Sequence, residues 1–414
     1  MKTFKTTKIG SRAIRPGNPV YIIFEVASTH QNNWKIAKDY VEQAADAGTD
    51  ALKFQLFEAD KLLNPIASGL KGTYDFFKTA ETPREWFPKL KKLCDNAGID
   101  LLCTPFDEDA ASYLNIIGVP AIKIASGELT NHQLLSHVAR FNKPVILSTG
   151  MATMDEVRTA VNVLRRNGCK QLVLLQCTSV YPMPYEDANV RAMQTLQKKF
   201  NAVVGYSDNG SEGFLVPLLA VALGASVIEK HVTSHKDRGN LDDKFSMTVA
   251  EFTEMVKRIR RLEKQFEGHL EDAVDGLKKE FGRDVETALG DGIKKPAEHG
   301  THKTHPGVKG LFIQKESDER HWARRGFYPA RLIQKGTKIT SEMLISLRPD
   351  IGVSALSLGD VIGKVAAEDL PAKLPIKPEN RRVRRFRKSD IKKTYRDKEG
   401  AQFAKILEES ALFD

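Results

Sequence analysis

Polar or charged side chains interrupt several short apolar runs of this sequence, in two cases as pairs separated by one residue. Lys53 and Gln55 form one such pair, and Glu229 and His231 form another. Alternate residues of a β-strand point to the same face, so each pair presents two polar groups to one side. Lysine binds anions, whereas glutamate and histidine transfer protons or bind metals. Such groups are costly inside apolar runs unless they meet partners, so the pattern indicates a polar site.

Hydroxyl groups and glycine-rich turns follow other apolar runs. The residues concerned are Lys123, Ser126-Gly127-Glu128, Ser148-Thr149-Gly150, Thr178-Ser179 and Ser207. Two lysines among hydroxyls and glycine-rich turns make a cradle for phosphate and carboxylate groups. Glu25, Glu128, Glu229 and His231 are candidates for acid–base chemistry or metal binding. Taken singly, each has an ordinary explanation, such as turn chemistry or a structural histidine.

The elements that must position these side chains are short runs rich in Val, Ile and Leu, which alternate with amphipathic stretches. Eight runs are predicted to be strands: 20–26, 50–55, 99–103, 121–125, 144–147, 172–176, 202–206 and 226–231. An amphipathic helix can be placed after each run, and glycines such as Gly48 and Gly98 suit helix ends. Eight βα units within about 250 residues predict a closed (β/α)8 barrel. In such a barrel, strand C-termini face the active site.

The last barrel helix and the segment after it set the first domain boundary. Thr248 and Glu251 have the spacing of a capping box, and an apolar face follows them to 262. The periodicity weakens after Phe266, so residues 1–266 are predicted to form the barrel domain. Residues 267–325 are predicted to form a charged linker. Its histidines, His299, His302 and His305, favour a polar loop over a metal-binding tract because no cysteine accompanies them.

A second, smaller module is predicted over residues 326–380. Ala330–Thr337 and Val361–Ala366 read as strands, which indicates a compact β-rich fold near the lower size limit for independent folding. Residues 381–414 form a basic C-terminal extension, densest over Arg381–Lys388. A solvated extension or a basic rim that attracts anionic substrates is favoured over nucleic-acid binding, since no nucleic-acid motif accompanies the run.

Composition limits the class of protein. The formal net charge is +10 and 41% of residues are hydrophobic, which is ordinary for a globular chain with a sizeable core. No apolar run is long enough for a transmembrane helix, and no secretory signal is evident. The four cysteines lack metal-binding spacing, so reduced, buried thiols and a cytoplasmic location are expected.

At these residues the chain resembles the nonulosonic (sialic) acid synthase family. The matching motifs are Ile23-Phe24-Glu25-Val26, Leu52-Lys53-Phe54-Gln55, Thr104-Pro105-Phe106, Lys123-Ile124-Ala125-Ser126-Gly127-Glu128, Leu147-Ser148-Thr149-Gly150-Met151, Gln176-Cys177-Thr178-Ser179-Val180-Tyr181-Pro182, Gly205-Tyr206-Ser207-Asp208 and Ile228-Glu229-Lys230-His231. The small module, including Leu347-Arg348-Pro349, resembles the antifreeze-like (SAF) domain of the family. The resemblance covers nearly the whole chain except parts of the linker and the basic tail.

The resemblance implies a reaction and a set of roles. Phosphoenolpyruvate condenses with an N-acylated hexosamine, such as N-acetylmannosamine, to give a nine-carbon 2-keto sugar acid and phosphate. A divalent metal, Mn or Mg, near His231 would polarise the open-chain aldehyde. Glu25 would stabilise positive charge at C2 and direct water onto it. Phosphoenolpyruvate and its phosphate would be bound by Lys53, Lys123, Ser126, Ser148, Ser179 and Ser207.

The chain matches the family at the sugar-binding positions and differs from it at one metal-binding position. The sugar-side positions are Gln55, Thr104, Tyr181, Asp242 and Arg348. In the family, the residue matching Arg348 comes from the other subunit, which implies a domain-swapped homodimer. Asn209 stands where many members have a second metal-binding histidine, and an amide oxygen suits Mn less well than imidazole. Segment 74–86 is closest to the pseudaminic branch and Ser126-Gly127-Glu128 to the neuraminic and legionaminic branches, so the sugar stays open.

Two alternatives to this interpretation stay open, one within the same class of enzyme and one outside it. One is another phosphoenolpyruvate-dependent aldol synthase, for example one that makes an eight-carbon keto acid; the antifreeze-like module argues against it. The other is a homologue that binds a sugar acid without catalysis, in which Asn209 marks the loss of the metal.

Overall fold

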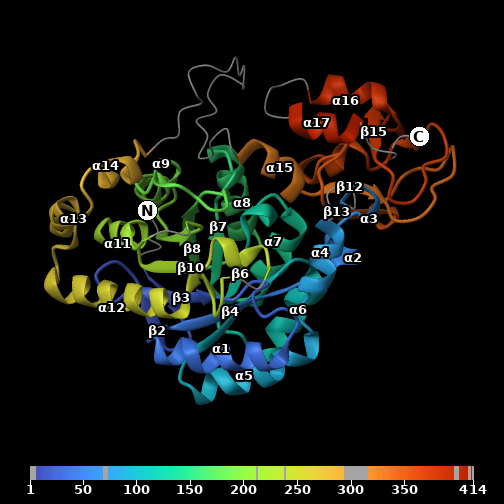
Figure 1. Cartoon of the computed structure of the whole chain (residues 1–414). Helices are drawn as coiled ribbons and strands as arrows, with labels where there is room; N and C mark the ends of the chain where they lie inside the picture. The colour runs from blue at the N-terminus through green and yellow to red at the C-terminus, as the bar shows by residue number, and fades with distance from the viewer. Residues whose placement is uncertain are drawn as a thin grey trace.

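A closed barrel with a smaller C-terminal module beside it makes up the molecule (Figure 1). The computed structural model describes residues 6–68, 73–210, 213–236, 239–292, 316–395, 401–408 and 412 of the 414-residue chain. The predicted α/β class, a (β/α)8 barrel followed by a small β-rich module, is confirmed.

Eight parallel strands form the barrel, and the pairing of β10 with β9 and with β3 closes it. The strands are β3 (Tyr21–Glu25), β4 (Ala51–Leu56), β5 (Asp100–Pro105), β6 (Ile122–Ile124), β7 (Val145–Ser148), β8 (Leu172–Cys177), β9 (Val203–Asp208) and β10 (Val227–Thr233). Each predicted run forms a strand whose ends differ from the prediction by at most two residues. The register places Glu25 opposite Lys53 on one side and opposite His231 on the other.

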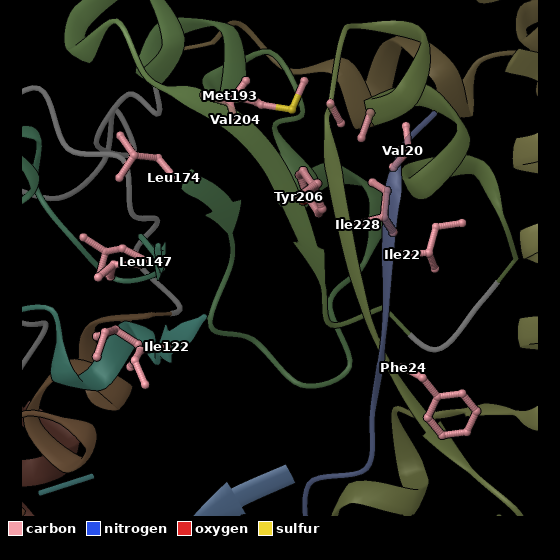
Figure 2. Close-up of a cluster of buried hydrophobic side chains, with 14 of the residues drawn as sticks. Val20, Ile22, Phe24, Ile122, Leu147, Leu174, Met193, Val204, Tyr206 and Ile228 are labelled. Atoms are coloured by element: carbon pink, nitrogen blue, oxygen red, sulfur yellow. The ribbon is translucent and has the colours of Figure 1, made fainter. Parts of the chain in front are cut away.

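Helices pack against the outer face of the barrel. They are α1 (Trp34–Asp46), α5 (Phe87–Asn96), α6 (Glu108–Ile117), α7 (His132–Val138), α8 (Met154–Arg166), α9 (Tyr185–Ala188), α10 (Ala192–Phe200), α11 (Leu215–Ala222) and α12 (Val249–Gln265). Three short helices after β4 lie instead beside the C-terminal module and the open end of the barrel: α2 (Ala59–Leu62), α3 (Pro65–Ser68) and α4 (Thr73–Ala80). Alternate strand residues, such as Ile22 and Phe24, point outward into this layer (Figure 2). The capping box of α12 between Thr248 and Glu251 is confirmed.

The inward residues of the strands form a second core inside the barrel. Tyr21, Ala51 and Val227, which lie at strand N-termini, contact Ile9 and Ile14 there. These two isoleucines come from the antiparallel hairpin β1 (Thr7–Ile9) and β2 (Arg12–Ile14). The hairpin therefore closes the N-terminal end of the barrel, and the polar strand ends lie at the opposite end.

The chain after α12 continues the barrel layer instead of leaving it. All eight residues of α11 are buried, so this helix is not amphipathic as predicted. Its outer side is covered by α13 (Ala273–Phe281) and α14 (Asp284–Leu289). Part of the predicted linker 267–325 thus belongs to the barrel domain. The three histidines of that linker lie outside the described residues.

The described residues of the C-terminal module form two small sheets and three α-helices. The elements are α15 (Ser317–Ala323), β12 (Gly326–Pro329), β13 (Leu344–Leu347), β14 (Val365–Ala366), β15 (Ile376–Glu379), β16 (Arg382–Arg385), α16 (Lys388–Thr394) and α17 (Ala401–Glu408). The strand predicted over Ala330–Thr337 is wrong: only Ile333 pairs there, through a single bridge to Leu370. Val361–Ala366 contributes a strand only at its last two residues.

The basic tail is part of this module. β16 pairs with both β14 and β15, and side chains of α16 and α17 share a core with Tyr328 and Ile351. Arg384 forms ion pairs with Asp390 at 2.6 Å and with Glu379 at 2.7 Å. The described part of the tail is therefore packed against the module and is not a solvated extension.

The state of the cysteines and the hydropathy of the helices were both predicted from the sequence. All four cysteines are free and buried. Across the residues that the structure describes, no helix combines the length and the apolar character needed to span a bilayer.

Candidate active site

A cavity of about 680 Å³ opens where the barrel strands end. All but two of the predicted site residues line it: Glu25, Lys53, Gln55, Thr104, Lys123, Ser126, Ser148, Tyr181, Ser207, Asn209, Glu229, His231, Asp242 and Arg348. The parallel register brings these side chains together, because every strand ends at the same rim. Glu128 and Ser179 lie behind the wall of the cavity.

A buried lysine between two carboxylates forms the floor of the cavity. Lys53 Nζ lies 2.7 Å from Glu25 Oε2 and 3.6 Å from Glu229 Oε2. It also donates to Thr104 Oγ1 at 3.2 Å, and Gln55 Nε2 donates to Glu25 Oε1 at 3.0 Å. Lys53 is thus held by groups on both neighbouring strands, β3 and β5.

The electrostatics of this floor follow from burial and from the charges that face each other. Burial raises the pKa of Glu25, and Glu229 adds to the rise while Lys53 opposes it. Burial also acts against the charge on Glu229, but Lys123 and Lys53 outweigh it and lower the pKa of Glu229. Glu25 is therefore the carboxylate better suited to take up a proton, and Glu229 the one that stays ionised.

The second lysine lies beside the hydroxyl groups. Lys123 Nζ donates to Ser148 Oγ at 2.7 Å and lies 3.6 Å from Glu229 Oε1, which accepts from Ser207 Oγ at 2.9 Å. Burial lowers the pKa of Lys123. An incoming anion would meet a desolvated ammonium flanked by hydroxyl donors, which is a strong arrangement for phosphate.

Gly150 permits two hydroxyl-bearing loops to approach each other. A Cβ at Gly150 would lie 2.9 Å from Ser126 Oγ and would also clash with Ser179 Oγ. The Gly150 amide donates to Ser126 Oγ at 3.0 Å. The Ser179 hydroxyl is buried here without a hydrogen-bond partner among the described residues. The structure therefore brings Ser179 next to the loops predicted to bind phosphate but not onto the cavity wall.

His231 and Asn209 are the two predicted metal ligands, and both face the cavity. Burial lowers the pKa of His231 to about 4, so its imidazole is neutral near neutral pH. Its Nδ1 has no hydrogen-bond partner in the part of the chain that the structure describes. The Asn209 amide donates to the Thr178 carbonyl at 2.8 Å, which leaves its oxygen free to accept or to bind a cation. No cluster of three or more His, Cys, Asp or Glu side chains suited to a metal occurs in the described ranges. Metal binding by His231 and Asn209 therefore stays a prediction.

The sugar-side residues lie around the mouth of the cavity. Tyr181 is 46% exposed and packs on Phe245, with ring centroids 4.8 Å apart. Asp242 accepts from the backbone N–H of Ser28 at 2.9 Å and from its hydroxyl group. Ser28 also lines the cavity.

Arg348 reaches the cavity of its own chain from the end of β13. Its guanidinium lies 2.7 Å from Glu128 Oε1, and Arg325 lies 2.7 Å from Glu128 Oε2. Burial acts against ionisation of Glu128, but Arg325 and Arg348 outweigh it and lower its pKa. This position favours holding Arg348 over proton transfer, although the catalytic role of Glu128 stays a prediction. The domain-swapped homodimer also stays a prediction.

Four phenylalanines form an apolar wall that the sequence interpretation did not assign to the site: Phe57, Phe76, Phe77 and Phe106. They belong to one buried cluster around α4. The adjacent aromatic residues Phe76 and Phe77 were the available signal. Glu319 and Ala323 of α15 also line the cavity, but they fall in the predicted linker, where no pattern marked them.

The fold and this site together define a barrel synthase with an SAF domain, and comparison with known proteins specifies the family. The NeuB family model matches residues 40–270, and the SAF domain model matches residues 324–380. The chain belongs to the NeuB family, the nonulosonic acid synthases.

Individual relatives match most of the chain. An uncharacterized protein of Methanocaldococcus jannaschii is 36% identical over 87% of this chain and 94% of its own length. The N,N'-diacetyllegionaminic acid synthase of Legionella pneumophila is 35% identical over 85% of this chain and 92% of its own. The crystal structure of the spore coat polysaccharide biosynthesis protein SpsE of Bacillus subtilis superposes with a TM-score of 0.70, at 28% identity over 89% of this chain and 97% of its own.

Proposed function

We propose that this chain condenses phosphoenolpyruvate with an N-acylated hexosamine to give a nine-carbon 2-keto sugar acid and phosphate. The observation that carries the proposal is the pair of buried lysines, Lys53 and Lys123, which share Glu229 at 3.6 Å each beneath a ring of hydroxyl groups. An anionic substrate that ends in phosphate matches this charge pattern. The legionaminic acid synthase relative supports a sugar acid product.

The proposed reaction joins C3 of phosphoenolpyruvate to the aldehyde carbon of the open-chain sugar, whose oxygen takes up a proton. Positive charge then develops at C2, where the carboxylate of Glu25 stabilises it. Water adds to C2 and gives a proton to Glu25, whose raised pKa suits it as a base. The C2–O bond to phosphate then breaks while the new C2 hydroxyl gives its proton to the departing phosphate, so that phosphate leaves and a ketone remains at C2.

The other residues of the cavity bind and orient the two substrates. Lys123, Ser148 and Ser207 are proposed to hold the phosphate, with Ser126 and Ser179 in the adjoining loops. Gln55, Thr104, Tyr181, Asp242 and Arg348 are proposed to contact the sugar. His231 and the oxygen of Asn209 would hold a divalent cation, Mn or Mg, which supplies Lewis-acid polarisation of the aldehyde when bound.

The test is phosphate release from phosphoenolpyruvate with a panel of acceptors and added Mn or Mg. The panel contains N-acetylmannosamine, its 6-phosphate, the diacetamido hexoses and arabinose phosphate. Sugar-dependent release with at least one N-acylated hexosamine is the expected result. Release with arabinose phosphate alone would identify an eight-carbon keto acid synthase, and no release with any acceptor would favour the non-catalytic alternative.

A further inference from the structure

A buried carboxylate from the C-terminal module touches the phosphate-binding end of the barrel. Glu316, which immediately precedes α15, is 0% exposed. Its Oε1 accepts from the backbone N–H of Met151 at 2.9 Å and from that of Ser179 at 2.6 Å. Met151 belongs to the loop after β7 and Ser179 to the loop after β8. One carboxylate therefore ties together two loops that carry proposed phosphate ligands.

The helix after Glu316 holds the same loop from the other side. The carbonyl oxygen of Met151 accepts from the guanidinium groups of Arg320 and Arg324. Both arginines also pair with Glu156 in the first turn of α8, at 2.9 and 3.6 Å. The N–H and the C=O of Met151 are thus both bound by the segment from Glu316 to Arg324.

Met151 needs such support because of its backbone conformation. Its φ is +51°, in the left-handed region that residues other than glycine seldom adopt. This conformation follows directly on Gly150, the glycine that lets Ser126 and Ser179 approach. The loop geometry that gathers these hydroxyl groups therefore depends on contacts supplied by the C-terminal module.

Glu316 itself lies behind the cavity wall, whereas Met151, Ser126 and Ser148 line the cavity. A carboxylate that competed with phosphate would have to face the cavity. We infer that Glu316 is a positioning residue, whose carboxylate fixes the two phosphate-binding loops and makes phosphate affinity depend on docking of the C-terminal module. This inference rests on the proposed function, since it takes the cavity to bind phosphoenolpyruvate.

The same segment extends to the sugar side of the cavity. Arg325 follows Arg324 directly and pairs with Glu128, the carboxylate that also holds Arg348. Docking of the module thus orders the phosphate loops and brings Arg348 into place together. By thermodynamic reciprocity, phosphate bound in the cavity stabilises the docked module to the same extent.

The test compares Glu316→Ala, Glu316→Gln and the wild-type chain. The alanine variant loses both charge-assisted hydrogen bonds, so the Kd for inorganic phosphate and the KM for phosphoenolpyruvate should rise roughly tenfold or more, with a smaller change in kcat. The glutamine variant keeps an acceptor and should give an intermediate Kd. Glu342→Gln, which removes one exposed charge from the same module, is the matched control.

Binding measured by calorimetry and turnover measured by steady-state kinetics distinguish failure of this inference from failure of the proposed function. A Kd for phosphate that is unchanged in Glu316→Gln and Glu316→Ala would overturn the inference, and a lower Kd would identify Glu316 as a competitor of phosphate. If the alanine variant does not fold, the Kd for phosphate of the glutamine variant still tests the inference. A wild-type chain that binds phosphoenolpyruvate without turnover would refute the proposed function but leave the role of Glu316 measurable.

Discussion

At the residue scale, the proposed reaction depends on the ion pairs that two buried lysines form with two buried carboxylates. Lys53 lies nearest to Glu25, and Lys123 shares Glu229 with it. The identities of these groups could be predicted from the sequence, because polar residues spaced by one in apolar runs must converge where parallel strands end. The places of Glu128 and Ser179 could not, because they depend on loops and on arginines distant in sequence.

Replacing Lys123 with methionine should weaken phosphoenolpyruvate binding strongly. The change keeps the length of the side chain but removes the buried ammonium that faces Ser148 and Glu229. We expect kcat/KM for phosphoenolpyruvate to fall by about 100-fold, which corresponds to roughly 3 kcal/mol. Steady-state kinetics would show it. The exposed Lys198→Met on α10 is the control, and equal kcat/KM in the two variants would contradict the assignment.

Replacing Asn209 with histidine should strengthen metal binding. Imidazole is a better ligand for Mn than an amide oxygen, and His231 already faces the same cavity. The Mn concentration that gives half-maximal activity should fall by about tenfold. Titration of the chelator-treated protein with Mn measures this concentration. No change in it would argue that position 209 does not bind the cation.

At the element scale, the barrel strands and α12 were predictable and the helices after the barrel were not. Short apolar runs predict the strands, and a capping box followed by an apolar face predicts α12. In contrast, α11 is buried on every side because α13 and α14 cover it, so it shows no amphipathic period. The Ala330–Thr337 segment resembled a strand but anchors only through Ile333.

A substitution in the loop after β7 tests the shape of the loop and not a single side chain. Gly150→Ala should push Ser126 and Ser179 apart, since its Cβ would lie 2.9 Å from Ser126 Oγ. The free energy of unfolding should fall by about 1–3 kcal/mol, and the KM for phosphoenolpyruvate should rise. Denaturant unfolding and kinetics measure the two effects.

A matched glycine provides the control for that change. Gly276 lies in α13 with open space around its Cα, so Gly276→Ala should leave the KM unaltered and raise stability slightly. A KM for Gly150→Ala equal to that of the Gly276→Ala variant would show that the approach of the two hydroxyl groups does not matter.

At the scale of the whole molecule, the contact between the C-terminal module and the barrel brings Arg348 to the candidate site. Arg348 reaches its own barrel, and its backbone N–H donates to Leu62 O at 2.9 Å while Asn64 N–H donates to Arg348 O at 2.7 Å. Nothing in the local sequence of the module encodes where it docks, so this arrangement could not be predicted from residue patterns. The partners of Glu128 and the role of Glu316 follow from that docking.

Global stability should fall as the pH drops from about 6.5 to about 4. Burial lowers the pKa of His30 to about 4, and the ring packs against Trp86 with centroids 5.7 Å apart. Between the unfolded value near 6.5 and the folded value, the unfolded chain binds more protons, so stability is lost as pH falls through this window. The loss attributable to His30 is up to about 3 kcal/mol.

Thermal unfolding across this pH range tests the contribution of His30. His30→Gln removes the titrating group, and its Tm should therefore change less between pH 6.5 and 4.5 than that of the wild-type chain. A wild-type Tm that is flat over the window, or an equal slope in the variant, would contradict the assignment.

The most direct test of the central claim is to follow the bridging oxygen of phosphoenolpyruvate. With oxygen-18 between C2 and phosphorus, addition of water at C2 and cleavage of the C2–O bond place the label in inorganic phosphate. We predict labelled phosphate, released only when an N-acylated hexosamine is present, detected by mass spectrometry. Unlabelled phosphate with the label retained in the organic product, or release without sugar, would contradict the proposed condensation.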